Sequence, residues 1–328
     1  MSEKWDRVQA VLTGETADRV PVTMWRHFYD QETTAEGLAD SMLWFQREYD
    51  WDFMKVNPRA QYHVEDWGAG FHYAGDPYSG PTMVKAPIKS PQDWAKIQSL
   101  DPHKGVLGEH LRALRRIRQG LKGQVPFVMT VFNPVSIAGR MVEPETVLAQ
   151  HLREHPEKVT PALEAITETF RAFVTECLNV GVDGIFFATT AWASHDLLTE
   201  QEYAQFGRPY DLQVLEAARG ARFCILHVCR SNNMLRLLSN YPVHALNWDD
   251  RDPTNPTLKE ARGFTSKAFI GGVDRQVLTR SGSPEAAAQQ SRDALAQTGS
   301  LGIMVGPTCS ISPRSPEASL RAVKEAVS

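Results

Sequence analysis

The strongest pattern in the chain is a series of short apolar runs separated by longer amphipathic stretches. Eight runs rich in β-branched and aromatic residues recur along the 328 residues, at 20–25, 53–57, 126–132, 184–189, 223–229, 245–249, 268–273 and 302–306. Most are apolar at nearly every position, which is typical of parallel strands that are covered on both faces. Between most of them lies enough chain for a helix. The pattern predicts an α/β fold with eight strands, a single (β/α)8 TIM barrel.

Capping residues mark the starts of several helices between these runs. Thr199 stands three residues before Glu202, a spacing at which the hydroxyl and the carboxylate satisfy each other's backbone N–H groups. Serine followed by proline, at 90–91, 283–284 and 315–316, places an N-cap before a proline in the first helical position. A doubly wound open sheet is the competing architecture, but no Gly-x-Gly-x-x-Gly follows any run. The barrel is therefore favoured.

The segment between the second and third runs, 58–125, is longer than one crossover helix requires. It is rich in tryptophan, tyrosine, histidine, glycine and proline, most densely at 67–73. We expect an insertion after strand two, above the carboxyl ends of the strands, where such loops line active sites. The chain shows no internal repeat and no low-complexity tract, so residues 1–328 are expected to form one domain.

Composition narrows the class of protein. The chain is 42% hydrophobic with a net charge of −4, which is ordinary for a globular protein and gives no support for nucleic-acid binding. Its first residues are charged and no apolar stretch approaches the roughly 18 residues of a membrane helix, so neither a signal peptide nor a membrane span is expected. The cysteines are too few for a disulfide scaffold and fit a reducing cytoplasm: Cys177, Cys224, Cys229 and Cys309.

A histidine and two cysteines stand where a barrel places catalytic groups. His227 and Cys229 are two apart at the end of the fifth run, so their side chains share a face, and Cys309 follows the eighth run. Three such ligands leave a tetrahedral zinc with one open position. A substrate thiol arriving there would lose its proton, and the bound sulfur would stay nucleophilic because two cysteine thiolates already balance the ion's charge. The alternative is ordinary core packing, which we expect for Cys177 and Cys224.

Longer motifs resemble the uroporphyrinogen decarboxylase superfamily over nearly the whole chain. The similar segments are 7–14, 18–22, 181–184, 198–206, 271–274 and 312–317. The decarboxylases of this superfamily carry two arginines after strand one, an aspartate after strand two and Gly-His-Gly after strand eight. Here Arg26 matches the first arginine, but the other positions read Asp30, Asn57 and Pro-Thr-Cys at 307–309. The resemblance therefore does not extend to decarboxylation of uroporphyrinogen.

The chain is more similar to the zinc-dependent, corrinoid/coenzyme M-type methyltransferase branch of the superfamily. The metal motif of that branch, His-x-Cys on strand five and a cysteine after strand eight, matches His227, Cys229 and Cys309. The resemblance implies transfer of a methyl group between a corrinoid and a zinc-bound small thiol. The chain has no Asp-x-His-x-x-Gly corrinoid motif, so a methylcorrinoid (cobalamin) would arrive on a partner protein or as a free cofactor. A homodimer is also common in the family.

Other polar residues at strand ends are candidates for the site. We expect Asp249, or its neighbour Asp250, to orient His227 through the free ring nitrogen, with loop capping as the alternative. Arg26 is a candidate catalytic residue, and His27, Tyr29, Asn57 and Asn133 are candidate substrate contacts; a structural arginine and turn-shaping asparagines are the alternatives. Two rival functions remain open: a divergent decarboxylase acting on a smaller substrate, and a non-catalytic zinc-bearing partner in a corrinoid system.

Overall fold

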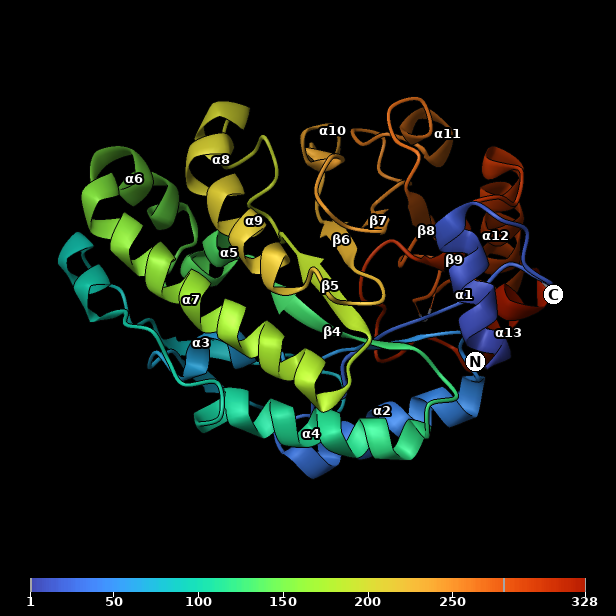
Figure 1. Cartoon of the computed structure of the whole chain (residues 1–328), viewed down its shortest axis with the longest axis horizontal. Helices are drawn as coiled ribbons and strands as arrows, with labels where there is room; N and C mark the ends of the chain where they lie inside the picture. The colour runs from blue at the N-terminus through green and yellow to red at the C-terminus, as the bar shows by residue number, and fades with distance from the viewer. Residues whose placement is uncertain (1, 280, 328) are drawn as a thin grey trace.

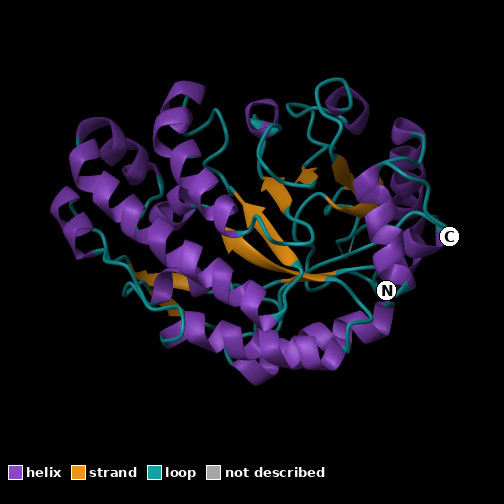
Figure 2. Ribbon diagram, in the orientation of Figure 1, coloured by secondary structure: helices purple, strands orange, loops and turns teal. Residues whose placement is uncertain are grey.

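The centre of the computed structural model, which describes residues 2–279 and 281–327, is a curled parallel sheet surrounded by helices (Figure 1 and Figure 2). Seven strands follow one another in the order β1, β4, β5, β6, β7, β8 and β9, and each neighbouring pair is parallel. Their bounds are β1 Met54–Val56, β4 Phe127–Phe132, β5 Gly184–Ala188, β6 Ile225–Val228, β7 Ala245–Trp248, β8 Ala268–Val273 and β9 Ile303–Pro307. Each overlaps one predicted run, so the α/β class is confirmed.

The first predicted strand, 20–25, was wrong as a strand. It is extended chain that touches β9 through an isolated bridge between Val22 and Val305, and the Val305 N–H donates to the Pro21 carbonyl (2.8 Å). On its other side the Asp52 N–H donates to the Val22 carbonyl (2.9 Å). A ladder cannot form here because Pro21 has no N–H and the Val22 N–H donates to the Asp52 carboxylate instead (2.7 Å).

Charged side chains fix this segment to the first helix, α1 (Glu3–Thr13). The Asp52 carboxylate is fully buried and accepts hydrogen bonds from the guanidinium groups of Arg7 (2.7 Å) and Arg19 (2.7 Å). Arg7 in turn donates to Asp18 (2.6 Å). A buried carboxylate with two arginines and a backbone donor is well compensated, so the cluster holds the segment between β9 and β1.

Helices cover the outer face of the sheet in Figure 1. The described helices other than α1 are α2 Ala35–Tyr49, α3 Tyr62–Glu65, α4 Gly105–Leu121, α5 Pro134–Gly139, α6 Thr146–Glu154, α7 Pro156–Val180, α8 Glu200–Phe206, α9 Arg208–Ala217, α10 Leu235–Leu238, α11 Leu258–Ala261, α12 Pro284–Thr298 and α13 Glu317–Glu325. None of the helices in the described ranges is both long and apolar enough to cross a membrane.

Each face of the sheet packs against its own hydrophobic core. Leu226 and Val228 of β6 belong to the outer core, which the helices cover, whereas Ile225 belongs to an inner core that Trp5 of α1 also joins. Side chains alternate along a strand, so His227 follows Ile225 onto the inner side. The same alternation places polar residues at the carboxyl ends of the strands on the inner side of the sheet, next to the inner core.

The long segment between β1 and β4 forms several elements of its own. After α3 come an antiparallel hairpin, β2 (Gly70–His72) with β3 (Thr82–Lys85), and a 3-10 helix, η1 (Pro91–Lys96). The crossover itself is made by α4, which packs against α2 and α7. The description of this segment as an insertion stays a prediction.

Most of the predicted helix starts are present. Thr199 and Glu202 form the capping box of α8, Ser90 and Asp93 form that of η1, and Ser283 caps α12 before Pro284. The third serine–proline pair was wrong as a cap, because α13 begins after Pro316 and the hydroxyl of Ser315 is buried without a hydrogen-bond partner.

Candidate metal centre and its cavities

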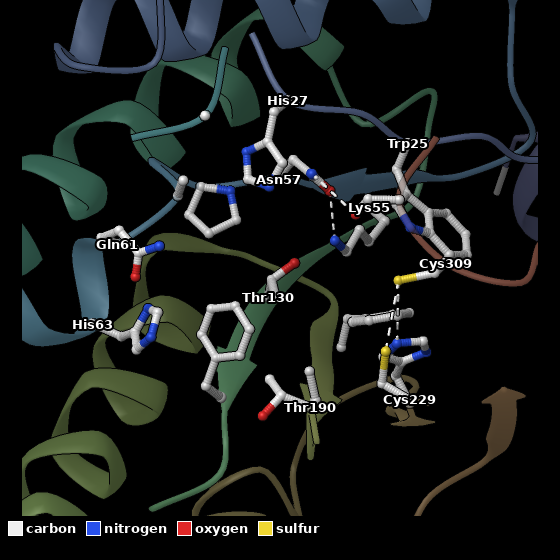
Figure 3. Close-up of a pocket in the computed structure, with 18 of the residues that line it drawn as sticks. Trp25, His27, Lys55, Asn57, Gln61, His63, Thr130, Thr190, Cys229 and Cys309 are labelled. Atoms are coloured by element: carbon white, nitrogen blue, oxygen red, sulfur yellow. Dashed lines mark hydrogen bonds between the residues drawn. The ribbon is translucent and has the colours of Figure 1, made fainter. Parts of the chain in front are cut away.

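The three predicted metal ligands lie together at the carboxyl ends of β6 and β9. The Sγ atoms of Cys229 and Cys309 are 3.9 Å apart, and the Sγ of Cys309 is 3.7 Å from Nε2 of His227 (Figure 3). The potential ligand atoms of the three residues all lie within 4.8 Å of one another. His227 is buried, and its ring stacks on that of Phe186 with the centroids 5.2 Å apart.

This arrangement fits a tetrahedral ion. A zinc–sulfur bond of about 2.3 Å and a tetrahedral angle place two thiolates roughly 3.8 Å apart and a thiolate and an imidazole nitrogen roughly 3.6 Å apart. Two of the three observed separations, 3.9 Å and 3.7 Å, agree with these values, and the third lies within 4.8 Å. Two sulfurs and one nitrogen are also the donor set that zinc prefers, so the residues present fit a zinc ion with one position open.

Asn247 orients the imidazole of His227. The two residues lie opposite each other in the pairing of β6 with β7, and Nδ1 of His227 is hydrogen-bonded to Oδ1 of Asn247. The Asn247 amide nitrogen donates to the carbonyls of Ile270 (2.8 Å) and Pro307 (3.1 Å). Because those two acceptors fix which end of the carboxamide faces the ring, the Nδ1 atom of His227 carries the proton and Nε2 is left to bind a metal.

The two thiols differ sharply in acidity. The hydrogen bond from Cys229 lowers the pKa of Cys309 well below its usual value, and His227 and Arg275 add to that effect. The same hydrogen bond, together with burial, raises the pKa of Cys229 well above its usual value. The pair therefore readily holds one negative charge, and a second charge needs a cation such as a metal ion.

An inner cavity of about 360 Å³ opens beside the thiols. It is lined by residues from β1, β4, β5 and the segment after residue 24: Trp25, His27, Tyr29, Lys55, Asn57, Pro58, Ala60, Gln61, His63, Gly80, Pro81, Thr130, Phe132, Arg140, Phe186, Ala188, Thr190, His227, Cys229, Cys309 and Ser310. A volume of this size suits a small molecule. The lining contains lysine, arginine and histidine but neither aspartate nor glutamate.

Lys55 is one of the residues of this cavity that the sequence analysis missed. Its side chain is buried, and its ammonium donates to Oδ1 of Asn57 and lies 4.7 Å from the ring centre of Phe186. Burial lowers the pKa of Lys55 to about 7, which the charges of Cys309 and Glu32 partly oppose. A charged residue inside an otherwise apolar run was the available signal, because lysine is rarely buried without a partner.

Three of the predicted substrate contacts do line the inner cavity. The ring of His27 stacks on that of Tyr29, with the centroids 4.9 Å apart, and its Nδ1 is 2.9 Å from a carboxylate oxygen of Glu32. Asn57 accepts from Lys55 and donates weakly to the hydroxyl of Ser310 (3.4 Å). Glu32 is itself buried and fixed by backbone donors, so the position of His27 is well defined.

Arg26 and Asn133 do not line the inner cavity. The guanidinium of Arg26 donates to the Pro313 carbonyl (2.6 Å) and lies over the ring of Phe28, 4.6 Å from its centre. Asn133 accepts from the Ser136 N–H as the N-cap of α5 and donates to the buried Asp211 carboxylate (3.0 Å). These contacts agree with the structural alternatives given for both residues, and a catalytic role of Arg26 and a substrate contact of Asn133 stay predictions.

The two aspartates after β7 do not contact His227. The Asp250 carboxylate accepts from the Gly272 N–H (2.9 Å), and Asp249 accepts from the Arg251 N–H (3.3 Å). The expected orienting bond therefore comes from Asn247. Asp249 instead lines an outer cavity of about 570 Å³, together with Arg140, Thr190, Cys229, Arg230, Ser231, Arg251, Asp252, Pro253, Asp274, Arg275, Gln276, Thr308 and Cys309. The two cavities thus meet at the thiols.

Left-handed backbone gathers next to the thiols. Among non-glycine residues with positive φ, Thr190 (44°), Arg230 (75°) and Asn232 (50°) follow β5 and β6 rather than ending a helix. Such conformations cost roughly 1–3 kcal/mol each and persist where the surroundings enforce them, often at functional sites. Thr190 and Arg230 both line the outer cavity, which supports the same location for the site.

Comparison with known families agrees with this geometry. Residues 3–328 match the family described as Uroporphyrinogen decarboxylase (URO-D). The chain belongs to the URO-D family. A match over nearly the whole length also places every element of the sheet and both cavities within the family domain.

Within the family, similarity to methyltransferases extends over nearly the whole chain. The chain is 23% identical to a methylcobamide:CoM methyltransferase, MtbA, of Methanosarcina acetivorans, over 98% of this chain and 96% of that protein. A uroporphyrinogen decarboxylase of Klebsiella pneumoniae is 28% identical, over only 45% of this chain and 42% of that protein. A solved methyltransferase structure from Methanosarcina mazei superposes with a TM-score of 0.85 at 20% identity, covering 99% of this chain and 98% of that one, which shows a shared fold.

Proposed function

We propose that this protein is a zinc-dependent methyltransferase that moves a methyl group between a corrinoid, carried by a partner protein, and a small thiol. The observation that carries the proposal is the trio of His227, Cys229 and Cys309, whose separations fit a tetrahedral ion with one open position. Full-length similarity to MtbA supports the reaction class. We also propose that the segment 20–26 stands in for an eighth strand and closes the curled sheet into a barrel.

A bound zinc ion would lower the pKa of a thiol at its fourth position and keep the sulfur nucleophilic. The chain's own residues prepare that position. Asn247 holds the imidazole with Nε2 directed at the thiols, and the inner cavity opens beside them. A cavity of about 360 Å³ accepts a small thiol, so the corrinoid would have to approach from the outer cavity.

The charges balance for this reaction. A thiol loses its proton on binding, its sulfur forms a bond to the methyl carbon, and both electrons of the broken cobalt–carbon bond stay on the corrinoid. Lys55, buried beside the thiols and with its pKa lowered to about 7, is placed to hold a proton inside the inner cavity. The inner cavity has no carboxylate that would repel an incoming thiolate.

Removal of one ligand tests the proposal. In a Cys309→Ser variant we expect the zinc content to fall from about one ion per chain to near zero and methyl transfer to fall by at least roughly a thousandfold, because a lost ligand removes the tetrahedral set. Zinc is measured by mass spectrometry of the purified chain and transfer by loss of the thiol. Cys177→Ala, which removes a buried thiol of α7, is the matched control and should keep its zinc.

The same pair of variants separates the rival functions. Unfolding of the chain on zinc removal would indicate a structural clamp in a non-catalytic partner. Full folding and unchanged activity of the zinc-free chain would contradict the zinc-dependent methyltransferase proposal.

A further inference from the structure

The inner cavity has two ends of different chemistry. Figure 3 shows Gln61 and His63 on the opposite side of the cavity from Cys229 and Cys309, with Lys55 between them. A thiol bound at the metal position would therefore extend past Lys55 toward Gln61 and His63.

The middle of the cavity needs a negative charge. Within the described part of the chain, Lys55 makes no ion pair with a carboxylate, and its one hydrogen bond is to the neutral carboxamide of Asn57. The charges of Cys309 and Glu32 offset only part of the cost of burying its ammonium. A buried ammonium is stable only when it is paired or neutral. Arg140 adds a second cationic group to the lining, and no acidic side chain of the lining opposes either. An anionic group on the ligand would complete this part of the site.

The far end of the cavity needs a hydrogen-bond donor. Oε1 of Gln61 and Nδ1 of His63 are both buried and without hydrogen-bond partners, and His63 is 4% exposed. Burial, together with the nearby Arg140, lowers the pKa of His63 well below its usual value, so its ring is neutral. A carboxamide oxygen can only accept, and leaving it unpaired in a buried site costs about 1–3 kcal/mol.

That donor should be uncharged. An ammonium group at the Gln61 end would lie in a cavity that already holds Lys55 and Arg140 and that has no carboxylate. Like charges in a partly buried site repel, whereas a hydroxyl or an amide N–H supplies the donor without that penalty.

Resting on the proposed function, we propose that the thiol substrate is an acid that also carries a neutral hydrogen-bond donor, as in a hydroxy-acid thiol or an N-acylated amino-acid thiol. Its sulfur lies at the metal position, its anionic group at Lys55 and its hydroxyl or amide N–H at Gln61 and His63. A plain anionic thiol would satisfy Lys55 and leave the far end unpaired.

Three thiols that share one four-carbon acid skeleton test this assignment: homocysteine, its analogue with a hydroxyl in place of the amine, and its analogue with hydrogen there. Binding is followed on the full chain loaded with cobalt(II), whose absorption changes when a thiolate joins the metal. We expect the hydroxyl form to bind about tenfold more tightly than the hydrogen form, the worth of one buried hydrogen bond. The amine form should bind more weakly than the hydroxyl form.

Matched variants tie the preference to its residues. Gln61→Met should remove the advantage of the hydroxyl form and leave the affinity for the hydrogen form within about twofold. Gln9→Met, on the exposed face of α1, should change neither affinity. Lys55→Met should weaken the binding of all three acids by roughly tenfold or more.

Three outcomes overturn the inference: equal affinity for the hydroxyl and hydrogen forms, tighter binding of the amine form, or a hydroxyl preference that survives Gln61→Met. In each case the cobalt spectrum would still show thiol entering at the metal, so the proposed function would stand. A spectrum that no thiol changes would overturn both.

Discussion

The two sides of the candidate site differ in how completely the protein satisfies its own polar groups. On the metal side, the ring of His227 is fixed by Asn247, and Asn247 is fixed by two backbone carbonyls. Elsewhere in the inner cavity the polar groups are less complete: within the described residues Lys55 forms no ion pair with a carboxylate, and at the far end Gln61 and His63 each bury an unpaired polar atom. The difference indicates that the metal side is organised before any ligand arrives, whereas the other side is completed by the ligand.

After loss of a ligand itself, the largest effect should come from breaking the organised side at Asn247. In Asn247→Leu we expect metal affinity, measured by competition with a chelator, to fall about 10–100-fold, because the imidazole loses the acceptor that fixes its tautomer. Asn133→Leu is the control, since Asn133 is equally buried and hydrogen-bonded but bonds to Asp211 rather than to His227. It should lower the free energy of unfolding and leave metal affinity unchanged. Equal losses of affinity in both variants would contradict the comparison.

Removing the unpaired charge of the other side should stabilise the protein. We expect Lys55→Met to raise the free energy of unfolding of the metal-free chain by roughly 1–2 kcal/mol, because a buried ammonium without a counter-ion is replaced by an apolar side chain. The pKa of Lys55 is about 7 in the folded chain and 10.5 in the reference state, so the unfolded chain binds more protons between these values. Wild-type stability therefore rises with pH across that window.

Urea unfolding at several pH values checks this sign. The advantage of Lys55→Met should be largest below pH 7 and disappear above about pH 10.5. Lys96→Met is the control, because Lys96 is exposed and pairs with Asp93. An advantage of Lys55→Met that does not vary with pH would show that Lys55 carries no unpaired charge.

The smallest effect on thiol binding is expected at Arg26. This residue tests whether every buried unpaired polar atom near the site takes part in binding, or only those that line a cavity. Arg26 also buries an unpaired nitrogen, Nε, but it lines neither cavity. In Arg26→Gln we expect thiol affinity to stay within about twofold. The melting temperature should fall, because the hydrogen bond to Pro313 and the stacking on Phe28 are lost, which together contribute about 1–2 kcal/mol of stability. Calorimetry and a thiol titration measure the two quantities. A large loss of thiol affinity would show that Arg26 belongs to the binding site.

The sequence predicts the metal side better than the ligand side, for a geometric reason. His227 and Cys229 are two residues apart on a buried strand, and that spacing alone places them on one face. To place Cys309 beside them, the prediction needs only that the carboxyl ends of the strands meet at one edge of the sheet. Asn247 was missed because it contacts His227 through the register of β6 with β7, which no local pattern specifies.

The ligand side depends on side-chain directions that sequence spacing does not give. Arg26 and His27 are neighbours, yet His27 lines the inner cavity and Arg26 packs against the rings of α2. The packing of α2 and of the segment near Pro313 decides between them. The first apolar run failed as a strand for a similar reason, because the Asp52 carboxylate takes the N–H that a ladder would use.

The placement of Cys309 after β9 has a consequence for the order in which the chain is made. Cys309 is synthesised 80 residues after Cys229, a delay of roughly 4–16 s on the ribosome. Until then a nascent chain offers only two of the three ligands, and the segment 20–26 lacks its neighbour β9. Binding of the proposed metal ion and the proposed closure of the sheet would therefore become available together, late in synthesis, and a chain interrupted before β9 would lack both.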